Sequence, residues 1–138
     1  AIYHPKDLPA MLSVADFIVI SCPYTPETEG LIGESELKAM NPGSVLINVG
    51  RGAIVDEPSL IRFLRLGHLG GAALDVTTEE PLPEDSPLWD IPNVLLSAHS
   101  GSSVDSENQV LTRLFCDNLR RYLSDQPLRN VLNRTRLY

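Results

Sequence analysis

The chain has 138 residues, 43% of them hydrophobic, which is enough for one globular domain with a core. Its formal net charge of −7 excludes nucleic acid and anionic membrane surfaces as favoured partners. No apolar run is long enough to span a bilayer, and Cys22 and Cys116 have no metal-ligand spacing, so we expect a soluble, cytoplasmic protein without a metal site.

Helices and strands are predicted to alternate along the first hundred residues. In chain order they are a helix over residues 7–15, a strand over 17–21, a helix over 33–40, a strand over 44–49, a helix from Asp56 to Gly67, and strands over 72–76 and 94–98. The short, branched apolar runs are typical of strands buried on both faces. The alternation indicates right-handed crossovers and a parallel sheet covered on both sides. The predicted fold class is α/β.

Two further segments differ from this alternation of helices and strands. Residues 77–93 contain four prolines and five acidic side chains and are predicted to form a long functional loop. Residues 100–108 supply capping residues for a long C-terminal helix. Its apolar stripe is predicted to pack in a core and consists of Val110, Leu111, Leu114, Phe115, Leu119, Tyr122 and Leu123.

Polar side chains gather where the predicted strands end. In a parallel sheet these ends share one edge, and ligands bind there. The segments concerned are residues 21–24, 48–52, 75–80 and 97–100, and they include Arg51, Asp75, Glu80 and His99. An arginine that holds a carboxylate and an imidazole that exchanges a proton are what interconversion of a hydroxy acid and a keto acid requires. Since no side chain donates hydride, a nicotinamide would have to be bound.

Each of these residues also has a simpler interpretation. On residue type alone Arg51 is more often a solvated turn residue, but Gly50 and Gly52 favour a tight turn that approaches a ligand. His99 alone is more often a hydrogen-bonded core histidine, and the acidic loop residues could simply keep the loop soluble. Asp75 is predicted to lie at the strand end with a donor in reach, because a buried, unpaired carboxylate is costly.

Other site chemistries fit less well. The segment Gly50 to Gly52, with Asp75 downstream, resembles a dinucleotide fingerprint, but Val55 replaces the third glycine, so we do not assign the pyrophosphate site here. No serine has the G-x-S-x-G setting of a nucleophile.

The residues resemble the D-isomer-specific 2-hydroxyacid dehydrogenase family, which includes glyoxylate and hydroxypyruvate reductases and phosphoglycerate dehydrogenase. The matching stretches, in the family's order, are ADFIVISCPYTPETEGLIG, residues 37–89 around NVGRGAIVDE, and IPNVLLSAHSGSSV. The resemblance implies that Arg51 holds the substrate carboxylate, that His99 is the general acid and base, and that Glu80 pairs with His99. It also implies NAD or NADP as cofactor, with contacts from Cys22, Pro23, Val49, Gly50, Arg51, Asp75, His99 and Gly101.

The resemblance covers only the second half of the family's nucleotide domain. It implies the second half of a Rossmann-like, doubly wound parallel sheet, with residues 1–100 as a partial NAD(P)-binding domain and 101–138 as a C-terminal helix and tail. The chain begins without methionine, and the family's first half has no counterpart in it, so we expect a piece of a longer enzyme with a missing N-terminal half. A half-sheet with an exposed inner edge strand tends to pair with another copy or with its missing half, so we also expect a homodimer. The alternative is a truncated, noncatalytic module that senses nucleotide or assembles with a partner.

Overall fold

The structure is a computed structural model that describes residues 2–101 and 103–135, so residues 102 and 136–138 of the predicted C-terminal segment lie outside the described part. The chain divides into two compact units, Ala1–Gly101 and Ser102–Tyr138. The first unit contains a 3-10 helix Pro5–Asp7, α1 Leu8–Leu12, β1 Phe17–Ile20, α2 Glu34–Ala39, β2 Val45–Asn48, a 3-10 helix Gly52–Ile54, α3 Glu57–Arg65, β3 Gly71–Leu74, a 3-10 helix Pro87–Asp90 and β4 Val94–Leu96.

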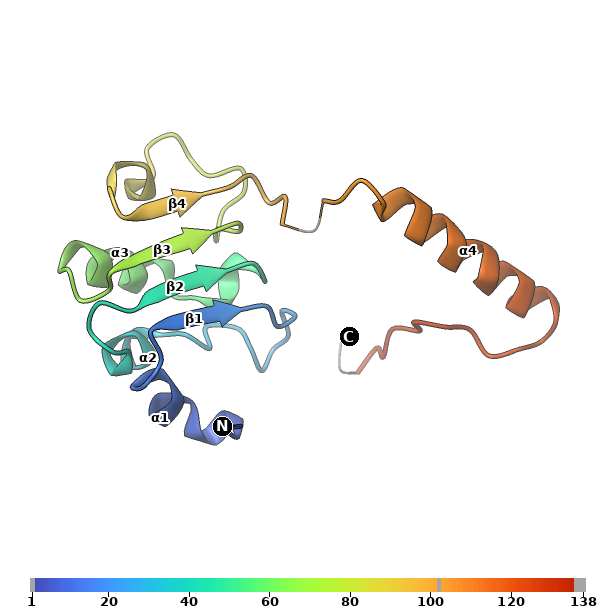
Figure 1. The fold of residues 1–138 in the computed structure, drawn as a ribbon, viewed down its shortest axis with the longest axis horizontal. Coiled ribbons are helices and arrows are strands. Elements are labelled where there is room, and N and C mark those ends of the chain that lie inside the picture. The colour runs from blue at the N-terminus through green and yellow to red at the C-terminus, as the bar shows by residue number, and fades with distance from the viewer. Residues whose placement is uncertain (1, 102, 136–138) are drawn as a thin grey trace. The chain divides into compact units, whose positions relative to one another are not determined.

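The four strands form one parallel sheet in the order β1-β2-β3-β4. Ile18 is paired in register with Leu46, and Leu46 with Ala72. Each strand therefore ends at the same edge, as the arrows in Figure 1 show. The predicted α/β class is confirmed, and the strand ends differ from the predicted ones by no more than two residues.

Within residues 2–101, helices cover only one face of the sheet. Ile18 and Ile20 of β1 are buried, whereas Phe17 is 69% exposed and Val19 is 59% exposed. Successive right-handed crossovers that add each strand on the same side place all connecting helices on one face. Figure 1 accordingly shows α2 and α3 behind the strands. The prediction of a sheet covered on both sides is wrong for the first unit taken by itself, residues 2–101.

The core lies between this covered face and the helices. Leu12, Leu37 and Leu46 are fully buried there, from α1, α2 and β2. On α3 the predicted apolar face is confirmed, because Leu60 and Leu64 are buried. Burial of an aliphatic side chain contributes about 1.5–3 kcal/mol each, so α3 is firmly fixed to the sheet.

The second unit consists of α4, Glu107–Leu123, and the segment after it. The predicted apolar stripe lies on α4, and its own unit does not bury it, because none of the helix's residues is buried. That the stripe packs in a core stays a prediction. Two hydrogen bonds hold the segment after α4 against the helix. Asn118 Nδ2 donates to the Arg129 carbonyl at 3.0 Å, and Asn118 Oδ1 accepts the Arg129 N–H at 2.8 Å. No helix within the described ranges has the length and apolarity of a membrane span.

Candidate active site

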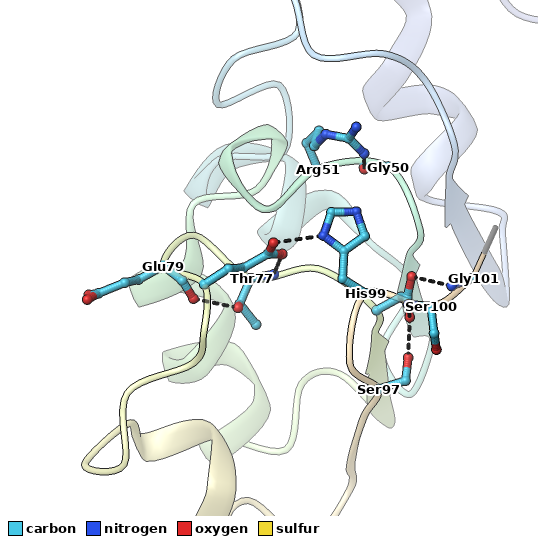
Figure 2. Close-up of polar contacts among 10 residues, drawn as sticks. Gly50, Arg51, Thr77, Glu79, Ser97, His99, Ser100 and Gly101 are labelled. Carbon is cyan, nitrogen blue, oxygen red and sulfur yellow. Dashed lines mark hydrogen bonds and ion pairs between the residues drawn. The ribbon is translucent and has the colours of Figure 1, made fainter. Parts of the chain in front are cut away.

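An acid–base pair lies at the carboxyl edge of the sheet. His99 Nδ1 and Glu80 Oε2 are 2.7 Å apart, and the Thr77 N–H donates to Glu80 Oε1 at 3.1 Å (Figure 2). The pKa of Glu80 is lowered mainly by the hydrogen bond from His99. The hydrogen bond from the Thr77 N–H and the charge of Arg51 lower it further, whereas burial raises it. An ionised carboxylate only accepts hydrogen bonds, so Nδ1 of His99 carries the proton. Nε2 is thereby left to face a ligand.

The backbone of His99 is in the left-handed region, with φ of 51°. This conformation is uncommon for residues other than glycine, although histidine is among those that adopt it most often, and it occurs frequently at functional sites. The two following N–H groups, of Ser100 and Gly101, turn towards a single carboxylate, that of Asp75. The same turn therefore presents the imidazole on one side and a backbone clamp on the other.

Asp75 follows β3 directly and is only 8% exposed. Its carboxylate accepts hydrogen bonds from Ser97 Oγ at 2.5 Å, Ser100 N at 2.9 Å and Gly101 N at 2.8 Å, which confirms the predicted donors at the strand end. The Ser97 bond, followed by those of Gly101 and Ser100, lowers the pKa of Asp75. A carboxylate accepts about four hydrogen bonds, so these three leave one position for an external N–H donor such as a nicotinamide carboxamide.

Arg51 follows β2 in a turn that is closed by Asn48. The Asn48 side chain is 1% exposed, donates to the Arg51 carbonyl at 2.9 Å and accepts the Gly50 N–H at 3.0 Å. Arg51 Nη1 donates to the Gly50 carbonyl at 2.7 Å, so its remaining guanidinium donors are available to a ligand (Figure 2). Sequence reasoning placed Asn48 at this edge but gave it no role; a polar residue that ends a buried strand was the available signal.

The two glycines beside Arg51 are required by packing within the chain. Neither has a positive φ. A Cβ on Gly52 would collide with the Thr77 carbonyl, and a Cβ on Gly50 would lie 2.9 Å from the Cys22 carbonyl. The backbone that approaches both glycines belongs to neighbouring loops, which is a second reason for glycine at these positions. That the turn also approaches a ligand stays a prediction.

Two neighbouring cavities connect these groups. One, of about 640 Å³, is lined by Asp75, His99 and Glu80, and the other, of about 250 Å³, is lined by Arg51 and Glu80. Glu80 lines both cavities. The remaining residues predicted to contact a cofactor follow β1 and β2 at the same edge, with Cys22 half-buried and Pro23 and Val49 exposed. In the described part of the chain, no group of three or more His, Cys, Asp or Glu side chains could hold a metal.

Replacement of Gly52 with alanine is expected to destabilise the chain and to displace the loop that carries Glu80. The added Cβ would collide with the backbone of Thr77, which cannot move aside as a flexible side chain can. Forced overpacking of this kind costs roughly 1–3 kcal/mol in the free energy of unfolding, measured by urea denaturation. Gly33→Ala serves as the control, because its Cβ would meet the flexible end of Glu36 at 3.3 Å. Equal stability losses in the two variants would contradict the packing argument.

The free energy of unfolding is expected to fall with acid. The pKa values of Asp75 and Glu80 are lowered in the folded chain from ordinary values of 3.8 and 4.5. Their contribution is therefore complete above those ordinary values and is lost as the pH falls through the lower folded values. Urea denaturation between about pH 5 and pH 3 measures this loss. Asp75→Asn should flatten the dependence, and a slope identical to that of the parent chain would refute the assignment.

The fold and the site together define a class of protein. A parallel α/β sheet with an acid–base pair, an arginine and a clamped carboxylate at its carboxyl edge is typical of a nucleotide-dependent dehydrogenase domain of the Rossmann type. The sequence model of the family described as "D-isomer specific 2-hydroxyacid dehydrogenase, NAD binding domain" matches residues 1–101. The chain belongs to this family, as its residues indicated, and the predicted class of cofactor agrees with the family's description.

Curated relatives carry names from the same group of enzymes. The chain is 44% identical over 127 residues to glyoxylate/hydroxypyruvate reductase B of Pectobacterium carotovorum, and the match covers 92% of this chain and 40% of the relative. It is 40% identical over 129 residues to glyoxylate reductase of Aeropyrum pernix, where it covers 94% of this chain and 38% of the relative. The chain thus spans about two fifths of the length of these relatives.

Solved structures agree with the fold. A D-isomer specific 2-hydroxyacid dehydrogenase from Xanthobacter autotrophicus, in complex with NADPH and MES, is 38% identical with a TM-score of 0.90 and covers 96% of this chain and 54% of that one. An NADPH-dependent glyoxylate/hydroxypyruvate reductase from Sinorhizobium meliloti, in complex with NADP and sulfate, is 33% identical with a TM-score of 0.91 and covers 99% of this chain and 44% of that one. The Rossmann-like fold is therefore shown by sequence family and by shape.

Proposed function

We propose that the chain is the C-terminal part of an oxidoreductase that transfers hydride between NAD(P)H and a 2-keto or 2-hydroxy acid. The observation that carries this proposal is the bond of 2.7 Å between His99 Nδ1 and Glu80 at the same sheet edge as Arg51. It combines a proton donor, a fixed tautomer and a carboxylate-binding cation.

Each of the three residues has a separate role in the proposed reaction. Arg51 binds the carboxylate of the keto acid with its free guanidinium donors. In its doubly protonated form His99 gives the Nε2 proton to the carbonyl oxygen as the carbonyl carbon is reduced, and is left neutral with its proton on Nδ1. In the reverse direction this neutral ring takes the hydroxyl proton at Nε2. Glu80 holds the Nδ1 proton throughout, so the ring keeps its orientation. A nicotinamide bound at this edge supplies the hydride.

The cofactor would be NAD or NADP, held at the carboxyl edge. Asp75 has one acceptor position free for the carboxamide N–H of the nicotinamide, and the Gly101 N–H keeps that carboxylate in place. Cys22 and Pro23 after β1, and Val49 and Gly50 after β2, would form the adjoining wall and backbone contacts. Arg51 and His99 would flank the nicotinamide from the substrate side.

The rest of the enzyme would come from residues that precede this chain. In this proposal residues 1–100 form the second half of the NAD(P)-binding domain, and 101–138 form a helix and tail that return to the substrate domain. The match to about 40% of the relatives' length supports a missing N-terminal half. The enzyme would be a cytoplasmic homodimer, consistent with two cysteines that are both free thiols.

The test is an assay of the protein, in its native length, with glyoxylate and hydroxypyruvate in the presence of NADH or NADPH. We expect oxidation of one or both cofactors that depends on the keto acid, because relatives at 40–44% identity carry the names of reductases of these acids. Tight cofactor binding without turnover of any keto acid would instead support a noncatalytic, nucleotide-sensing module.

A further inference from the structure

A glutamate outside the acid–base pair is bonded to the loop that carries it. Glu57 is the first residue of α3, and its Oε2 accepts the N–H of Thr78 at 2.9 Å, across 21 positions of the sequence. Asp56, at the N-cap, makes no capping hydrogen bond with its side chain. The acidic side chain at the start of this helix is therefore directed to another loop rather than to its own helix.

The loop bonded by Glu57 also orients the acid–base pair. Thr78 directly follows Thr77, whose N–H donates to Glu80 Oε1 at 3.1 Å, and Glu80 Oε2 in turn bonds His99. The Thr77 hydroxyl donates to the Glu79 carbonyl at 2.7 Å and closes the turn between them (Figure 2). These hydrogen bonds, joined through the backbone between Thr77 and Thr78, connect the first turn of α3 to the imidazole.

The two ends of this series differ in how firmly they are held. Leu60 and Leu64 of α3 are 1% and 3% exposed, so packing fixes the helix that bears Glu57. Thr78 and Glu80 lie in an exposed loop that has no core side chain of its own from Thr78 to Pro81. Without an external anchor such a loop samples several conformations, and the carboxylate of Glu80 moves with it.

We propose that Glu57 is a positioning residue that fixes residues 77–80 so that Glu80 orients His99 for proton transfer. Its effect on turnover rests on the proposed function, whereas its effect on the imidazole does not. The nearby Gly52, which packs against the Thr77 backbone, supports the loop by steric contact, and Glu57 supplies the directional bond. A misplacement of about 1 Å in a catalytic group can lower the rate by up to 10²-fold.

The first experiment compares Glu57→Ala, Glu57→Gln and Glu79→Ala in keto-acid reduction by the protein in its native length. Glutamine keeps an oxygen that accepts the Thr78 N–H, whereas alanine removes it. Glu79→Ala removes a negative charge from the same loop, and its side chain has no hydrogen bond or ion pair among the described residues. We expect Glu57→Ala to lower kcat on the order of 10-fold to 10²-fold with KM for the reduced cofactor, NADH or NADPH, unchanged, and the other two variants to keep kcat within about twofold.

A loss of kcat in Glu57→Gln as large as in Glu57→Ala would overturn the proposal, because the charge rather than the hydrogen bond would then matter. An equal loss in Glu79→Ala would overturn it for the same reason. An unchanged kcat in Glu57→Ala would show that the bond to Thr78 does not position the pair.

The second experiment reads the imidazole directly by ¹⁵N NMR of labelled histidine. The parent chain and Glu57→Gln should show neutral His99 mainly with its proton on Nδ1, as the bond to Glu80 requires. In Glu57→Ala the proportion of the Nε2–H tautomer should rise. This result would support the proposal even if no keto acid were reduced, and an unchanged tautomer in Glu57→Ala would overturn it.

Discussion

Replacement of His99 with alanine is expected to lower kcat for keto-acid reduction by about 10²-fold to 10⁴-fold, the usual contribution of a general acid or base. Nε2 is the nitrogen left free by the 2.7 Å bond between Nδ1 and Glu80, so no neighbouring group replaces the lost proton donor. The dissociation constant for the reduced cofactor, NADH or NADPH, should change only a few-fold, because Asp75 keeps its three hydrogen bonds from Ser97, Ser100 and Gly101. Steady-state kinetics and calorimetric titration with the reduced cofactor measure the two quantities.

The matched control is His4→Ala, at an exposed position near the start of the chain. Its kcat should equal that of the parent protein. Glu80→Gln should lie between the parent and His99→Ala, because a neutral amide still contacts Nδ1 but no longer selects the tautomer by charge. Normal turnover in His99→Ala would remove the imidazole from the mechanism.

Replacement of Arg51 with alanine is expected to reduce kcat/KM for the keto acid on the order of 10²-fold or more, the effect of removing a charge-assisted, bidentate contact from a ligand. Arg51 Nη1 donates to the Gly50 carbonyl at 2.7 Å, and the other guanidinium N–H groups are available to the ligand. Arg51→Lys should recover only part of the loss, because an ammonium group retains the charge without the planar fork.

The control for Arg51 is Arg65→Ala, on the exposed end of α3. It removes the same type of side chain without changing the sheet edge, so its kinetic constants should match those of the parent. If Arg51→Ala reduced glyoxylate and hydroxypyruvate at the parent rate, the proposed carboxylate site would be refuted.

Local patterns in the sequence were enough for the elements and for most of the site. Short branched runs and helix-ending residues predicted four strands and the helices between them, because these preferences act within a few residues of chain. The rule that parallel strands end at one edge then brought Arg51, Asp75 and His99 together. The choice of Glu80 among the loop acids depended on the family resemblance, and its bond to His99 is present in the structure.

Tertiary structure alone determined the features that depend on residues far apart in the chain. The exposed face that carries Phe17 and Val19 results from the direction in which each strand is added, which apolar runs do not encode. The exposed stripe of α4 has the periodicity of a buried one, because periodicity reports a face and not what covers it.

The same reason explains why the contacts of Glu57 and Gly52 could not be predicted from the sequence. Glu57 reaches Thr78 across 21 positions, and Gly52 meets Thr77 through the backbone. Neither contact has a periodic or compositional signature, because each exists only after β2, α3 and the loop beyond β3 have folded together. The amino-acid pattern therefore specified the chemistry of the edge, and the packing of these segments specified how its acid–base pair is held.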